Sequence, residues 1–399
     1  MVVKMKIVKN EIGKPSYLSV YHLAINLIGY ISLYNGLVKL YQQVKNNKQL
    51  NKFMEFANTA MLKDMAIELN ELYSFSDSIL PTAWDEYVKK YPEFKDYRIF
   101  LKKLRNNMKL FPKRKNIDSI LEKCKNKYPT NLLGVYKNDV VYYCGYFLGE
   151  NMIFGSNLYY EYVFYEPIKL CKNEGDLYKF TNSISSHLEA FYRMFESYVF
   201  KNEFDIPEVI LKERKRFFQI YSQTTSFQKM VKKSKYDRLT VFVFMLLIEE
   251  ISGMEIYLDY MIDLDKSIDD PILLYFFTQF VSIKYDQIRD SIDLLIKDGD
   301  KFDIDTVLLN SEIKELNIFN KDITDFAFKL RNFHHYTEVE KYELLLDELK
   351  KDESIDFVEL YKLVTNSEDW LEYKIMLFRM KNELHILVKF LRKNIGIRY

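Results

Sequence analysis

The chain has 399 residues, of which 48% are hydrophobic and 29% charged, so its composition is that of a globular protein and excludes a disordered or fibrous one. Lys and Arg number 58 against 57 Asp and Glu, so the formal net charge of +1 provides no overall field that draws the chain to nucleic acid or lipid. Only 11 Gly and 8 Pro interrupt a chain with 32 Tyr and 30 Phe. With so few helix breakers, we expect an all-α protein built from helical bundles.

Cysteine usage and hydropathy predict a cytoplasmic protein. Cys124, Cys144 and Cys171 form neither paired C-x-x-C units nor an even disulfide set, which argues against zinc and against an oxidised framework. The segment Met1–Asn10 lacks the apolar core of a signal peptide. The longest apolar run, Val241–Ile248, is far shorter than the roughly 20 residues that cross a bilayer, so it predicts a buried helix segment. We expect no membrane association.

The N-terminal region, residues 1–130, is predicted to be a helical bundle. Apolar residues recur every three or four positions from Tyr17 to about Tyr73, which is typical of amphipathic helices. Prolines then punctuate the chain, and the stretch Lys95–Lys127 carries an excess of basic residues. We place the end of this domain near Pro129.

The middle region, residues 131–238, is rich in aromatic residues, and its type stays open. The segments Val140–Tyr143 and Tyr159–Tyr165 fit either buried strands or aromatic helices. Helical periodicity returns near Ser183. A second basic stretch runs from Lys212 to Lys235 with aromatic residues inside it.

The C-terminal region, residues 239–399, is predicted to be a second bundle, and after Pro271 it contains no proline. The turn Asp298–Asp300 should close the helix before it, and Asp322 with Asp325 suits the start of another. That helix contains the side chains best suited to catalysis.

Two of the five histidines are adjacent in the segment Phe328–Tyr336. On a helix that turns about 100° per residue, Arg331 and His335 lie within roughly 40° of each other, and His334 lies about 60° to the other side. Metal-independent RNA cleavage needs such a pair: the imidazole takes the 2′-hydroxyl proton, and the guanidinium stabilises the charged phosphorane.

This segment resembles the signature of the HEPN superfamily, helical bundles that include metal-independent ribonucleases of toxin–antitoxin, abortive-infection and CRISPR systems. The signature is an Arg followed by a polar residue, then a His after four to six residues, and in some members a Tyr two positions beyond the His. Asn332 matches the polar position and Tyr336 completes an H-x-Y. His335, however, follows Arg331 after three intervening residues, which is shorter than the family spacing.

The resemblance implies a site and a mechanism. Arg331 would bind phosphate, and His335 or His334 would act as the base. Asn332 and Tyr336 would complete the catalytic site. It implies no cofactor and no metal, a homodimer or a partner protein, and a role in antiviral defence.

A repeated tetrapeptide adds to the resemblance. Lys103–Asn106 and Lys329–Asn332 both read KLRN, and each follows an apparent amphipathic helix. Met108 and Lys109 occupy the histidine positions of the first copy, so the chain would contain two HEPN-like bundles, the first without its acid/base group. A third Arg/His pair, Arg379 and His385, has Met380 at the polar position and ranks lower.

The basic residues of the first copy are the candidate RNA-binding surface. They are Lys102, Lys103, Arg105, Lys113, Arg114 and Lys115.

Other interpretations stay open beside this one. The two adjacent histidines fit a structural role, Arg331 fits a salt bridge to Asp325 or Glu338, and the basic stretches fit solvated helix faces. No Gly-rich phosphate loop, G-x-S-x-G elbow or H-E-x-x-H motif occurs, which excludes the nucleotide-dependent and serine-hydrolase classes. We predict an RNA-directed HEPN-like protein acting as a metal-independent endoribonuclease. The alternative is a non-catalytic helical scaffold or regulator that binds protein or nucleic acid.

Overall fold

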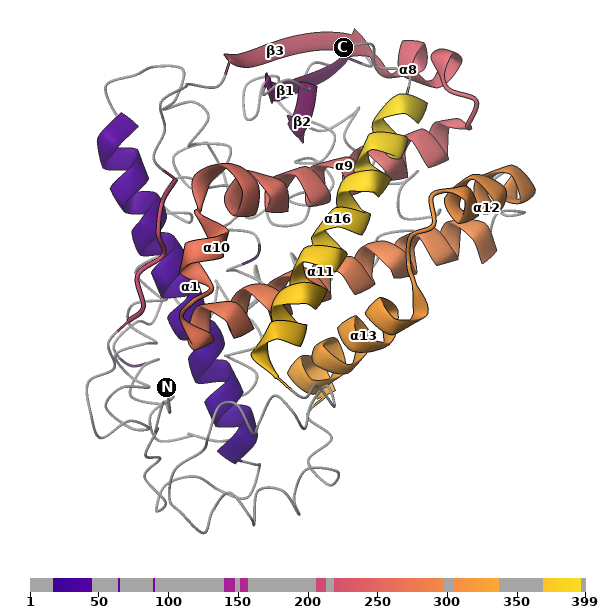
Figure 1. The fold of residues 1–399 in the computed structure, drawn as a ribbon. Coiled ribbons are helices and arrows are strands. Elements are labelled where there is room, and N and C mark those ends of the chain that lie inside the picture. The colour runs from indigo at the N-terminus through magenta and orange to yellow at the C-terminus, as the bar shows by residue number, and fades with distance from the viewer. Residues whose placement is uncertain are drawn as a thin grey trace.

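The computed structural model describes residues 17–44, 64, 89, 140–147, 151–156, 206–212, 219–297, 305–336 and 369–395. These residues are predominantly helical, which confirms the all-α prediction (Figure 1). The helices are α1 (Tyr17–Val44), α8 (Phe227–Lys233), α9 (Arg238–Glu255), α10 (Leu264–Ser267), α11 (Pro271–Lys297), α12 (Thr306–Glu315), α13 (Lys321–Tyr336) and α16 (Trp370–Asn394), with a π-helix, η1 (Ile256–Met261), directly after α9.

The middle region, whose type the sequence left open, contains a small antiparallel sheet. Its strands are β1 (Val140–Phe147), β2 (Asn151–Ser156) and β3 (Gln219–Ser226), in the order β2-β1-β3. Val140 pairs with Ser226 and Phe147 with Gln219, so β1 and β3 match along their whole length. The sheet lies next to α9, on the side away from α11 (Figure 1).

Acidic side chains cap the starts of several of the helices. Asp237 accepts a hydrogen bond of 2.7 Å from the main-chain N–H of Thr240 at the start of α9. Asp305 and Asp369 accept in the same way at the starts of α12 and α16. Each carboxylate satisfies a main-chain donor that has no partner inside its helix, so these short polar signals set where the helices begin.

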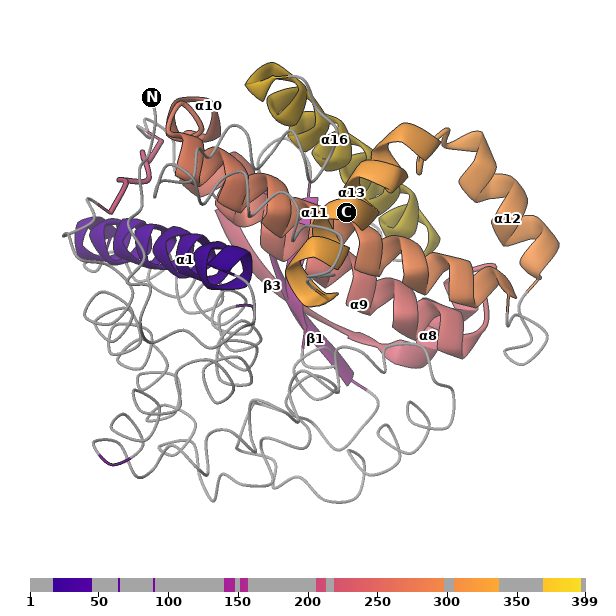
Figure 2. The same ribbon diagram turned by 90° about the horizontal axis from the view of Figure 1, so that it is seen from below.

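The core lies where α9, α11 and α16 meet. The whole segment Val241–Ile248 is buried, which confirms the buried-helix prediction. Figure 1 shows α16 lying across α9 and α11, and Figure 2 shows α1 beside α11. Tyr30 of α1 meets Phe276 of α11 edge to face, with ring centres 4.9 Å apart. The N-terminal helix therefore packs directly on the C-terminal helices.

The observed start of α13 lies within one residue of the predicted one. Its start lies at Lys321, one residue before Asp322, and its helical backbone continues through Tyr336. Helix α11 ends at Lys297, directly before the polar turn Asp298–Asp300 that was predicted to close it. None of the helices that the structure describes has the length and apolarity that a bilayer crossing demands.

A candidate site where helix 13 meets helix 11

The candidate site lies where α13 packs against α11. Because α13 is helical through Tyr336, positions 331 and 335 lie one turn apart on one side of it. Arg331 is half-buried, with 23% of its side chain exposed. The side chains of the other predicted catalytic residues lie outside the described part of the structure; these are Asn332, His334, His335 and Tyr336.

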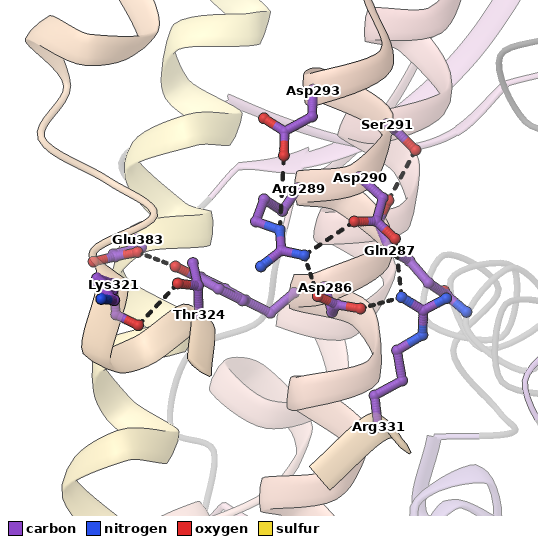
Figure 3. Close-up of polar contacts among 11 residues, drawn as sticks. Asp286, Gln287, Arg289, Asp290, Ser291, Asp293, Lys321, Thr324, Arg331 and Glu383 are labelled. Atoms are coloured by element: carbon purple, nitrogen blue, oxygen red, sulfur yellow. Dashed lines mark hydrogen bonds and ion pairs between the residues drawn. The ribbon is translucent and has the colours of Figure 1, made fainter. Parts of the chain in front are cut away.

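Arg331 is held by two carboxylates of α11. Its Nη1 forms an ion pair with Oδ2 of Asp286 and lies 2.9 Å from Oδ2 of Asp290 (Figure 3). Asp286 is fully buried, whereas 42% of the Asp290 side chain is exposed. Arg331 therefore does form salt bridges, which was one of the alternative interpretations, but its partners lie on α11 and Asp325 is not one of them. Glu338, the other partner considered, lies outside the described residues.

A second guanidinium completes the network, as Figure 3 shows. Arg289 Nη2 lies 2.8 Å from Asp286 Oδ1 and 3.1 Å from Asp290 Oδ1, and its Nε lies 3.8 Å from Asp293 Oδ2. Asp286 and Asp290 therefore each lie between two arginines. The network holds two cations and three carboxylates, so it is net negative.

Burial governs the titration of these groups. Burial raises the pKa of Asp286, although Arg331 and Arg289 favour its charged form. Burial also raises the pKa of Asp293. Burial lowers the pKa of Arg331, but its hydrogen bonds and charge interactions with Asp286 and Asp290 outweigh this and raise it. Arg331 therefore stays a fixed cation.

Two hydrogen-bond donors of the network lack an acceptor. The Nε atoms of Arg289 and Arg331 are buried and have no hydrogen-bond partner among the described residues. Both known contacts of Arg331 use Nη1, so part of its donor capacity remains for a ligand. The arrangement fixes a guanidinium at the edge of α13, but it does so by partly neutralising its charge.

A buried acid of α16 supports the site from the other side. Glu383 accepts hydrogen bonds from the Tyr285 hydroxyl, from the main-chain N–H of Phe319 at 2.7 Å, and from Asn320 Nδ2 at 2.5 Å. Burial and the hydrogen bond to Glu383 raise the pKa of Tyr285, so this phenol stays protonated and remains a donor. Glu383 thus ties the start of α13 to α11 and α16.

Several sequence predictions fall outside the described residues. All six candidate RNA-binding residues do, and so does the first KLRN copy. Arg379 pairs with Asp322 of α13. Six helical positions separate Arg379 from His385, which is about 120° around α16, so these two residues do not share a face.

Sequence reasoning missed the partners of Arg331. Asp286 and Asp290 lie on the amphipathic helix that precedes the second KLRN copy, but they were not predicted as partners of Arg331. Their spacing of four residues places two carboxylates on one face of a helix, and that signal could have indicated a site for a cation. Glu383 had no such signal, because it is a single acid in a helix. Among the described residues, no group of three or more His, Cys, Asp or Glu side chains is placed to hold a metal ion.

Comparisons with known proteins identify no relative. No protein-family model matches the chain, and neither a curated protein nor a solved structure is significantly similar to it.

Proposed function

We propose that the chain is an HEPN-like, RNA-directed protein that cleaves RNA without a metal ion, acts in the cytoplasm in host defence, and works as a homodimer or with a partner protein. The observation that carries the proposal is the position of Arg331. Its guanidinium is held in one place by Asp286 and Asp290 at the edge of α13, one helical turn before His335.

The register of α13 favours His335 over His334 as the base. Ala327 and Leu330 are fully buried, and position 334 falls on their side of the helix. Position 335 falls between Arg331 and the exposed Phe328. In the proposed mechanism, His335 takes the proton of the 2′-hydroxyl, and that oxygen bonds to the neighbouring phosphorus. The bond from phosphorus to the 5′-oxygen then breaks, and the leaving oxygen takes up a proton from solvent to give the 5′-hydroxyl. Arg331 stabilises the charge that develops on the phosphorane, and Asp286 orients Arg331.

A second function is favoured by the charge of the same network. Three carboxylates surround two guanidinium groups, and an approaching phosphate meets a net negative site. Such a network fits a helical scaffold whose α11–α13 contact is purely structural. This candidate is a non-catalytic regulator that binds protein or nucleic acid.

Cleavage of single-stranded RNA in EDTA separates the two functions. The enzyme should produce 2′,3′-cyclic phosphate and 5′-hydroxyl ends, because the attacking oxygen belongs to the substrate. His335→Gln should lower the rate per folded molecule by roughly two to four orders of magnitude. Lys329→Met, an exposed cation of the same helix, is the matched control and should leave the rate unchanged.

Two other results would argue against this enzyme. A requirement for magnesium or a 3′-hydroxyl product would reject this mechanism. The absence of cleavage, with protein that is folded and homogeneous, would favour the scaffold.

A further inference from the structure

A separate polar cluster joins α16 to α9 on the face of α16 opposite to Glu383. His385 Nδ1 lies 2.7 Å from Glu255 Oε1, and 37% of the His385 side chain is exposed while Glu255 is almost completely buried. Arg392 Nη2 lies 3.7 Å from the other Glu255 oxygen and donates to Ser252 Oγ at 3.0 Å. A buried carboxylate held by a buried guanidinium therefore fixes the imidazole ring.

Two lysines adjoin this pair. Lys381 lies one turn before His385 on the same face of α16, and its Nζ lies 2.5 Å from Asp259 Oδ1 of η1. Lys212 donates to the main-chain oxygen of Asp259 at 2.6 Å. Lys212 also interacts with Asp263, which forms an ion pair with Lys266 at 3.0 Å. Lys381, Lys212, Arg392 and Lys266 thus give four cations against the three carboxylates of Glu255, Asp259 and Asp263. The cluster is net positive even when His385 is neutral, unlike the network around Arg331.

The free nitrogen of His385 is the one that a ligand can reach. Glu255 occupies Nδ1, and Nε2 has no partner among the described residues. A carboxylate at Nδ1 favours a proton there and orients the ring, as it does for histidines that bind metals or act as bases. Glu255 is also the residue directly before the π-helix η1, and such helices are rare and frequent at functional sites.

We propose that His385 and Lys381 bind the phosphate group of a small ligand, with Glu255 as a positioning residue. A phosphate carries close to two negative charges and several acceptor oxygens, which match an imidazolium and an ammonium. The site is independent of RNA cleavage by α13.

Binding can be measured on the full chain by NMR with ¹⁵N-labelled histidine and inorganic phosphate. The His385 signal is assigned by its loss in His385→Gln. Phosphate should shift the ¹⁵N signal of His385 Nε2 in a saturable way, because the bound anion forms a hydrogen bond with that nitrogen. Lys381→Met should weaken phosphate binding by roughly tenfold or more, the scale of one lost hydrogen bond between charged groups. Lys389→Met, an exposed lysine four residues beyond His385, should leave binding unchanged.

Two further variants test the arrangement itself. Asp259→Asn should tighten phosphate binding, because it removes the carboxylate that competes for Lys381. Glu255→Gln should change the ratio of the two His385 tautomers in the absence of phosphate, which a purely structural contact elsewhere would not do. A His385 signal that ignores phosphate, or one that responds equally in wild type and Lys381→Met, would overturn the proposal.

Discussion

The Arg331 guanidinium carries one positive charge, which can neutralise the acids of α11 or a bound phosphate. Its Nη1 is committed to Asp286 and Asp290, and its remaining donors are not bonded within the described residues. A guanidinium fixed in this way has little orientation to lose when it meets a ligand. The same fixing makes Arg331 part of the folded core, so its removal should be felt in stability as well as in activity.

Arg331→Met should lower the free energy of unfolding by about 1 to 3 kcal/mol at pH 7, because the buried Asp286 carboxylate loses one of its two cations and keeps only Arg289. The pKa of Asp286, which burial already raises, should rise further in the variant. The folded variant then binds a proton that the unfolded chain does not, so its loss of stability relative to the unchanged chain should shrink as the pH falls from 7 towards 4. Urea unfolding at several pH values measures this.

The control for this measurement is Lys329→Met, which removes an exposed cation two residues earlier on α13. It should change stability by less than about 0.5 kcal/mol. A loss in Arg331→Met that is equally small, or that does not depend on pH, would mean that Asp286 does not need this partner.

At the scale of elements, the helices could be predicted from the sequence because their signals are local. Asp237 and Asp305 cap the helices that follow them, and the run Val241–Ile248 is buried as its composition requires. The sheet could not be predicted, because Val140–Tyr143 fits the periodicity of a strand and that of a helix equally well. Its pairing partner, Gln219–Ser226, also lies far along the chain. The spacing of Asp286 and Asp290 is a local signal for a cation site, but the identity of the cation is not, because Arg331 lies 41 and 45 residues away.

The connection between α12 and α13 depends on Glu383. Asn317 and Phe319 adopt positive φ angles of 51° and 61°, which side chains other than glycine rarely favour. Glu383→Ala should remove the acceptor that holds this turn and cost roughly 2 to 4 kcal/mol. Hydrogen exchange should accelerate at the turn first. Asn382→Ala, one residue earlier and exposed, should change neither quantity, and equal behaviour of both variants would contradict the assignment.

Two glycines of α1 make a matched test of helix packing. A Cβ added at Gly29 would lie 2.2 to 2.8 Å from atoms of Phe276, whereas one at Gly36 would lie 3.5 Å from Val209. Gly29→Ala should therefore destabilise the chain by about 1 to 3 kcal/mol through overpacking. Gly36→Ala should stabilise it by up to about 1 kcal/mol through helix propensity. Thermal unfolding of both variants would show the opposite signs, and a stabilising Gly29→Ala would mean that α1 does not pack on α11.

At the scale of the whole molecule, contacts cross the boundary predicted near residue 130. Helix α1 packs on α11, and Lys284 of α11 pairs with Asp64 at 2.6 Å and with Glu250 of α9 at 2.7 Å. All three side chains are at most 10% exposed. The Lys284 ammonium thus forms ion pairs with two acids from distant parts of the sequence. Its pKa is raised because the two acids outweigh burial, which lowers it.

Lys284→Met should cost about 3 to 5 kcal/mol at pH 7, because two buried carboxylates lose their shared cation. Adding Glu250→Gln should recover part of that loss, since one of the two charges is then removed, and a double-mutant cycle measures the coupling.

The loss in Lys284→Met should also shrink at pH 5, where the folded variant can protonate an acid that stays charged in the unfolded chain. Lys374→Met, which breaks an exposed pair with Asp265 at 3.9 Å, should change stability by less than about 0.5 kcal/mol. If the double variant is as unstable as the sum of its single changes, Lys284 and Glu250 are not coupled, and the contact with Asp64 alone holds Lys284 in place.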